Sequence, residues 1–168
     1  MSEAAQKALL EPDEKILEKM EAVITGKSTL GQLRGLKSND MEAIYSVAHS
    51  LYKQKRYADA EKMFRFLCLY GHLDQRFWTG LAASLQQQKK FREAVDAYSY
   101  NAILDVKNPQ NPLSAAYCYL ALGEFDQADN GVEGALHWAG DKKEYASIRV
   151  KAEALRAAIK QKKGEKAK

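Results

Sequence analysis

The side chains best suited to catalysis or metal binding are few in this sequence and lie far apart. The histidines are His49, His72 and His137, and the cysteines are Cys68 and Cys118. No two of them have the spacing of a zinc site or a redox pair. The sequence also has no glycine-rich phosphate loop and no nucleophile-elbow motif. We therefore predict a non-enzymatic protein with no catalytic residues, no metal site and no cofactor.

Composition and charge favour a folded domain with protein partners. The 168 residues, 46% hydrophobic and 29% charged, are typical of a chain that buries a core. The net charge of +4 is small, and residues 160–168 are interpreted as a basic, solvated helix end. The body of the chain lacks a basic and aromatic nucleic-acid pattern, so we predict no nucleic-acid partner. No segment resembles a signal peptide or membrane span, which predicts a cytoplasmic protein without direct membrane insertion.

The strongest pattern in the chain is an internal repeat with a period of 34 residues. Its marker is an aromatic residue three positions before an alanine, in the pairs Tyr57/Ala60, Phe91/Ala94 and Phe125/Ala128. A second alanine precedes each of these by 12 residues, at Ala48, Ala82 and Ala116. Small residues in such an arrangement let two antiparallel helices pack closely while large residues fill the flanks. Both the period and the pattern are those of the tetratricopeptide repeat.

This register predicts an all-α fold, a right-handed superhelix of three tetratricopeptide repeats. The repeats occupy 41–142, divided into 41–74, 75–108 and 109–142. Residues 1–40 form an N-terminal helical region, whose apolar stripe from Ile16 to Ile24 and short element at 28–33 are expected to cap the stack. Residues 143–168 form a C-terminal capping helix and basic tail. Asn111 before Pro112 predicts the N-cap and the first helical residue of repeat three.

The first helix of each repeat lines the concave wall of such a superhelix, and residues three or four apart share a face. We predict that this face binds an extended peptide. Its candidate contact residues are Tyr45, His49, Tyr52, Arg76, Thr79, Ala83, Gln86, Leu113, Tyr117 and Leu120. Tyrosine offers large, rigid contact area, so three tyrosines directed at the groove rather than the helix seam favour a binding wall. The alternative is that these tyrosines only pack in the repeat core.

The same wall lacks the basic residues with which some co-chaperones hold acidic C-terminal tails. Tyr45, His49, Gly80, Gln110 and Ser114 stand at the corresponding positions. The sequence therefore excludes a carboxylate clamp and predicts a ligand with apolar anchors.

Several segments match one known family closely. They are Thr29-Leu30, Tyr45-Ser46-x-Ala48, Phe64-Arg-Phe-Leu67-Cys68-Leu-Tyr70, Arg76-Phe77, Gly80-Leu81-Ala82-Ala83 and the run from Tyr98 to Pro112. They resemble the class II, tetratricopeptide chaperones of bacterial type III secretion systems, which hold the hydrophobic translocator proteins. The likeness is specific from 26 to 112 and looser to about 160. His49, where the family commonly has an aromatic residue, and the more basic tail depart from it.

The resemblance implies a bacterial, cytoplasmic chaperone that keeps hydrophobic translocators soluble before export, with an extended client segment in the groove. It also implies a homodimer when no client is bound, formed through the N-terminal region. Two alternatives remain at this point. One is a scaffold that joins two folded partners, and the other is a regulatory cofactor that binds a transcription factor.

Overall fold

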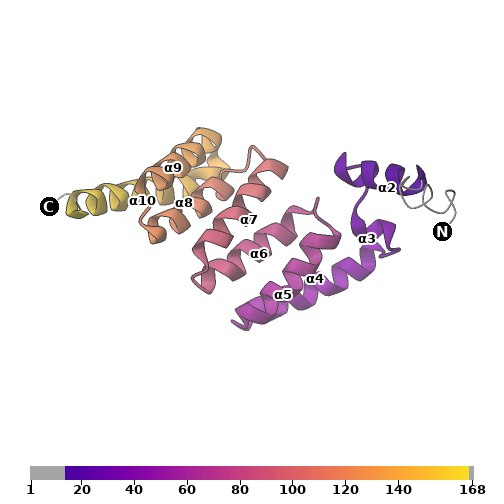
Figure 1. Cartoon of the computed structure of the whole chain (residues 1–168). Helices are drawn as coiled ribbons and strands as arrows, with labels where there is room; N and C mark the ends of the chain where they lie inside the picture. Colours follow the sequence, from indigo (N-terminus) through magenta and orange to yellow (C-terminus); the bar gives the residue numbers. More distant parts are fainter. Residues whose placement is uncertain (1–13, 167–168) are drawn as a thin grey trace, which may run out of the picture.

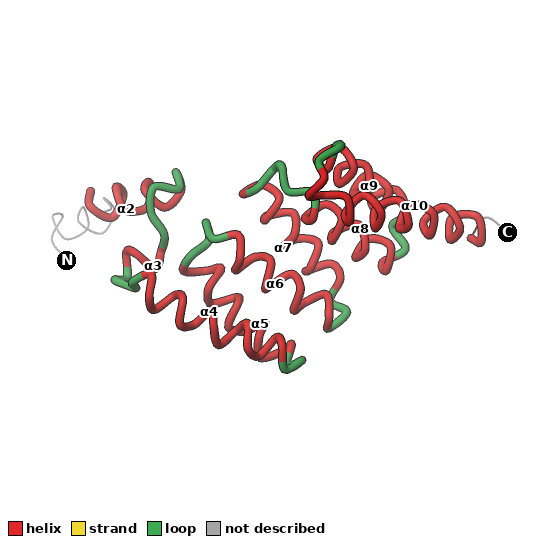
Figure 2. Tube along the Cα trace, turned by 180° about the vertical axis from the view of Figure 1, so that it is seen from behind, coloured by secondary structure: helices red, strands yellow, loops and turns green. Residues whose placement is uncertain are grey.

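The computed structural model describes residues 14–166, which contain helices and turns but no strand (Figures 1 and 2). The described chain begins with α2 (Glu14–Ile24) and the short α3 (Leu30–Leu33). Three antiparallel helix pairs follow: α4 (Ser38–Lys53) with α5 (Tyr57–Tyr70), α6 (Gln75–Gln87) with α7 (Phe91–Leu104), and α8 (Gln110–Leu122) with α9 (Phe125–Ala139). A 3-10 turn, η1 (Lys143–Tyr145), leads into α10 (Ala146–Lys166). The predicted all-helical repeat fold is confirmed.

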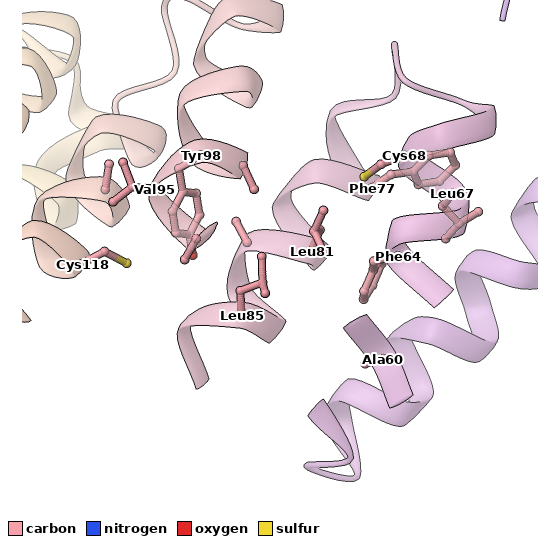
Figure 3. Close-up of a cluster of buried hydrophobic side chains, with 14 of the residues drawn as sticks. Ala60, Phe64, Leu67, Cys68, Phe77, Leu81, Leu85, Val95, Tyr98 and Cys118 are labelled. Carbon is pink, nitrogen blue, oxygen red and sulfur yellow. The ribbon is translucent and has the colours of Figure 1, made fainter. Parts of the chain in front are cut away.

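The core lies along the seams between successive helices, which pack on one another in chain order from α4 to α10. The six alanines of the repeat pattern are completely buried: Ala48, Ala60, Ala82, Ala94, Ala116 and Ala128. Large side chains fill the space between the repeats, as Figure 3 shows for Phe64 of α5 near Leu81 of α6. At the far end, Ala152, Leu155 and Ile159 of α10 close the stack. The C-terminal helix is therefore a cap, as predicted.

The turn inside each helix pair has the same construction three times. The residues at one repeat position have left-handed backbones, Lys55 and Lys89 with φ 61° and Gly123 with φ 74°. The next residue in each case donates its N–H back across the turn, from Arg56 to Leu51, from Lys90 to Leu85 and from Glu124 to Tyr119, each at 3.0 Å. This bond is typical of the Schellman motif, which ends a helix and turns the chain sharply. The repeat in sequence is thus also a repeat in backbone conformation.

The expected N-cap and first residue of the first helix in repeat three are wrong. The helix α8 begins at Gln110 after Pro109, and Asn108 Oδ1 accepts the Gln110 N–H at 3.0 Å. Asn111 lies inside the helix, is 3% exposed and accepts a hydrogen bond from Asn101. Proline is tolerated throughout a first turn, where N–H groups lack partners within the helix, so Pro112 did not fix the first residue.

The short helix α3, rather than α2, covers the front of the stack. It lies so close to α5 that a Cβ atom on Gly31 would stand 2.7 Å from the carbonyl oxygen of Tyr70. Every residue of α2 stays at least partly exposed, and Figure 1 shows this helix projecting beyond α3. Its stripe is exposed at Ile16 (51%), Met20 (54%) and Ile24 (80%). The expectation that α2 caps the repeats is therefore wrong, and its apolar face remains uncovered within the described chain.

Candidate peptide-binding groove

A cavity of about 360 Å³ lies between the first helices of repeats one and two. Six of the ten predicted contact residues line it: Tyr45, His49, Tyr52, Arg76, Thr79 and Ala83. Phe64, Gln75, Gly80, Asn101 and Asn108 complete the lining. The spacing of three and four along α4 and α6 brings the predicted residues to one hollow, because such positions share a helix face.

Tyr45 is the centre of the aromatic wall of this cavity. Its ring stacks on His49 with centroids 5.9 Å apart and meets Phe64 edge-on at 6.1 Å. The Arg76 guanidinium lies 4.8 Å from the centroid of the Tyr45 ring. Hydrogen bonds from Arg76 to Asp74 and Glu42 raise the pKa of Arg76 and hold its side chain over the tyrosine. The Arg76 charge at the rim of the groove is thus held in place and paired with two carboxylates.

Tyr45 and Tyr52 border the hydrophobic core and the cavity at once. Both are half-buried, both pack against the main core cluster and both line the cavity. Tyr52 meets Tyr57 edge-on at 5.3 Å, and burial raises the pKa of its hydroxyl. The expectation that they face the groove rather than the helix seam is therefore wrong, because each ring borders both. That they bind a client stays a prediction. A helical spacing gives the direction of a side chain but not its depth.

The floor of the cavity is made of small and polar residues. Thr79, Gly80 and Ala83 of α6 leave it shallow, and Asn101 of α7 donates from Nδ2 to Thr79 Oγ1 at 2.8 Å. Sequence reasoning missed Asn101 and Asn108, because it considered only the first helix of each repeat. One signal was available, since Asn101 interrupts a helix face otherwise made of apolar residues.

The other four predicted contact residues do not line this cavity. Gln86 is held by the hydroxyl of Tyr98, whose Oη donates to Gln86 Oε1 at 2.8 Å. Tyr117 is 38% exposed, and Leu120 is partly buried against the second core cluster. Leu113 is 0% exposed, so its expected role as a contact residue is wrong. It lies in a cluster with residues of α10, which packs on α8 and encloses a face that the earlier repeats leave open.

Neither cysteine of the described chain supplies a reactive thiol. Burial raises the pKa of the Cys68 thiol to about 12 and that of Cys118 to about 11, so both stay protonated and unreactive at neutral pH. Within residues 14–166, no three His, Cys, Asp or Glu side chains gather where they could hold a metal ion. Over the same range, every helix is too short or too polar to cross a lipid bilayer.

Comparison with known proteins identifies the repeat and a related chain. The tetratricopeptide repeat family model matches residues 41–74 and 77–108. The low calcium response locus protein H of Yersinia pestis is 37% identical over 144 residues, which cover 86% of this chain and 86% of the relative.

Three solved structures are similar over most of the chain. A T3SS complex from Aeromonas hydrophila has a TM-score of 0.81 and 33% identity, and covers 88% of this chain and 98% of its own. The Yersinia enterocolitica type III secretion chaperone SycD in complex with a peptide of the translocator YopD has a TM-score of 0.72 and 36% identity, with coverages of 76% and 98%. SycD is also known as an alternative dimer, with a TM-score of 0.72, 34% identity and coverages of 76% and 97%. The chain therefore belongs to the family of tetratricopeptide-repeat chaperones that serve the translocators of type III secretion systems.

Proposed function

We propose that this chain is a cytoplasmic chaperone that keeps hydrophobic translocator proteins of a type III secretion system soluble before export. An extended client segment lies in the groove between α4 and α6. The observation that carries the proposal is the cavity itself, with its aromatic wall at Tyr45 and Tyr52 and its shallow floor at Ala83. Such a hollow takes an apolar side chain of an extended peptide while the peptide backbone passes over the small floor residues.

The proposed role is a non-catalytic one, and the shape of the groove favours it over a general scaffold. No cysteine lines the groove, and the thiols of Cys68 and Cys118, which are buried elsewhere in the described chain, are protonated. A scaffold that joins folded domains does not need a hollow sized for one or two side chains, whereas a chaperone of extended segments does. Regulation through a transcription factor is compatible with the same groove, because it uses the same mode of binding.

The direct test blocks the floor of the groove. Ala83→Glu places a charge and extra volume in the cavity, and it should abolish binding of the YopD peptide that SycD binds, measured by fluorescence anisotropy. The matched control is Ala157→Glu, the same change at an exposed position inside α10, which should bind like wild type. Equal binding by both variants, with both folded by circular dichroism, would place the client elsewhere on the molecule.

Truncating the aromatic wall tests the same groove from the side. Tyr45→Ala and Tyr52→Ala should each weaken peptide binding roughly thirtyfold, as expected for a desolvated aromatic anchor worth about 2 kcal/mol. Because both rings also pack on the core, each change should lower the melting temperature as well. Affinity is therefore measured well below the melting transition. A variant that loses stability but keeps its affinity would identify that tyrosine as a core residue only.

We further propose that a second copy of the chain covers α2 when no client is bound. The exposed stripe of α2 borders a cavity of about 530 Å³ that also includes Leu30 and Leu33 of α3. A helix that is amphipathic but unburied in its own chain is suited to an interface between identical subunits. The dimeric form of SycD supports the same assignment.

A further inference from the structure

A second cavity of about 630 Å³, the front cavity, lies between the α2–α3 loop, the start of α4 and the α5–α6 loop. The hollow of about 360 Å³ between α4 and α6 is called the groove cavity below. Gln75 and Arg76, the first two residues of α6, line both cavities. The two cavities are therefore neighbours on one surface, and a chain that leaves one can enter the other.

The floor of the front cavity is apolar and open to a ligand. Leu36 and Met41 are half-buried there, and Leu73 is 42% exposed. Gly71 lets the floor close up, since a Cβ atom on it would stand 3.0 Å from Met41 Cε and 2.8 Å from Phe77 Cε2. Apolar surface of this kind is unfavourable in water, and an apolar side chain of a ligand removes it from water.

The rim of the front cavity carries the charges, and most of them are paired within the chain. Arg76 contacts Glu42 at 3.0 Å and Asp74 at 2.7 Å, whereas Lys27 has no ion pair among the described residues. The described lining places no charged group on the floor itself, so a charged ligand side chain would lose its hydration there without gaining a partner. The ligand group that fits the floor is therefore an uncharged, apolar side chain.

The distance between the cavities along α4 sets the spacing of the ligand side chains. Among the α4 residues of each lining, His49 is the middle one in the groove cavity and Met41 the middle one in the front cavity. These two positions are separated by about 12 Å, at a rise of about 1.5 Å per residue. An extended segment rises about 3.3 Å per residue, so about four of its residues cover this distance. Side chains four residues apart in an extended segment point to the same side, so both can face the chaperone.

We propose that the client segment continues from the groove cavity into the front cavity and places a second apolar side chain there, about four residues from the first. This site rests on the proposed function and adds to it a rule of spacing for the client. Between the two side chains the client main chain crosses the ion pair of Arg76 with Glu42, whose half-exposed atoms offer it donors and acceptors. One cavity accepts many apolar side chains, whereas two cavities at a fixed distance select segments with the matching spacing.

The test fills the front cavity from the side of the chaperone. Ser38 lines this cavity at the start of α4 and is exposed. Ser38→Trp places a large ring in the cavity and should weaken binding of the YopD peptide about tenfold, measured by fluorescence anisotropy. Asn39→Trp is the matched control, because Asn39 is the next residue of the same exposed turn and lies outside the described lining of both cavities. This variant should bind like the wild type.

An alanine scan of the same peptide measures the spacing. The peptide change that removes the first apolar side chain should have no further effect on Tyr45→Ala, because that contact is already lost. The change that removes the second should likewise have no further effect on Ser38→Trp. The two peptide positions found in this way should lie about four residues apart.

The remaining outcomes overturn one proposal or both. The front cavity takes no client side chain if Ser38→Trp binds like Asn39→Trp. The same conclusion follows if the two peptide positions are fewer than about three or more than about six residues apart. Weakened binding by Ala83→Glu and Tyr45→Ala then leaves the proposed function standing. If those two variants also bind like the wild type, the groove itself is wrong and the proposed function falls with the second site.

Discussion

The ring of Phe64 fills the space in front of Gly80. A Cβ atom built on Gly80 would stand 2.2 Å from Phe64 Cε1 and 2.3 Å from Cζ, distances far too short for non-bonded carbon atoms. Phe64 belongs to α5 of repeat one and Gly80 to α6 of repeat two, and both line the groove. The absence of one side chain therefore sets how closely two repeats approach and how wide the groove is.

Gly80→Ala should separate the two repeats and lower the free energy of unfolding by about 2 kcal/mol or more, because the Phe64 ring is itself enclosed and has little freedom to move. The measurement is urea unfolding followed by circular dichroism. The matched control is Gly134→Ala in α9, where a Cβ atom would meet Pro112 Cβ at an ordinary 3.5 Å. That change should be neutral or should stabilise by up to about 1 kcal/mol, because alanine favours helix. Similar effects from both changes would contradict this account.

The left-handed turn residues allow a change that stabilises the protein. Lys89 has φ 61° at the position where repeat three has Gly123. A non-glycine residue with this left-handed backbone lowers the stability of the fold by about 1 kcal/mol. Glycine avoids this strain but loses more backbone entropy on folding, so replacing the residue by glycine recovers only part of that free energy. Lys89→Gly should therefore raise the free energy of unfolding by about 0.5 kcal/mol, and Gly123→Lys should lower it by about 1 kcal/mol. Thermal melting of both variants checks the pair, and the same sign for both would contradict the argument.

The sequence identified the repeat fold because close helix crossings demand small residues at fixed spacing. Ala48, Ala60 and their equivalents are buried where the pattern requires them. The cap formed by α10 followed from the same logic, since its buried residues Ala152, Leu155 and Ile159 recur at helical spacing. Such local patterns indicate the helix–helix packing contacts that recur along the stack.

Features that depend on one particular neighbour were not predictable. The stripe of α2 has the pattern of a buried helix, but α3 occupies the front of the stack instead. Leu113 has the spacing of a groove residue, but the packing of α10 encloses it. Asn101 entered the groove from the second helix of its pair, which a rule based on first helices does not consider. A periodic pattern shows which residues share one face of a helix. Which other element packs against that face depends on the three-dimensional arrangement of the whole chain.

Glu61 joins repeat one to the turn of repeat two and makes stability depend on pH. Its carboxylate is almost buried and accepts hydrogen bonds at 2.8 Å from Arg65, Gln88 and Lys90. Burial opposes ionisation of Glu61, but these donors outweigh it and lower the pKa from 4.5 to about 2. A folded-state pKa below the unfolded value stabilises the protein above about pH 4.5, and this stabilisation is lost as the pH falls towards 2.

Glu61→Gln should therefore lower the free energy of unfolding at pH 7 by about 2 kcal/mol, less than the full shift implies because Arg65 and Lys90 are half exposed to water. The difference from wild type should shrink steadily below pH 4.5. Urea unfolding at pH 7, 5 and 3 at constant ionic strength measures it. Glu93→Gln, which removes an exposed partner of Arg65, is the control and should change stability by less than about 0.5 kcal/mol. A difference independent of pH would show that the Glu61 charge is not the cause.

The uncovered stripe of α2 gives a test of the dimer. The double change Ile16→Glu and Met20→Glu places two charges on a face that is half exposed in the single chain. A dimer formed through this face should dissociate, because the charges would be buried in an apolar interface without partners. Sedimentation velocity without client should show a dimer for the wild type and a monomer for the variant.

Helical content and peptide affinity distinguish loss of the dimer interface from misfolding of the repeats. Because α2 contributes no buried residue to the stack, the monomeric variant should keep the helical content of the wild type and its affinity for the YopD peptide. Val150→Glu changes a residue of α10 that is 71% exposed and outside the α2 face, and this variant should remain dimeric. A double variant that still sediments as a dimer would move the interface away from α2. In that case the apolar stripe of α2 would stay exposed to water when no client is bound. Such exposure of apolar surface is energetically unfavourable.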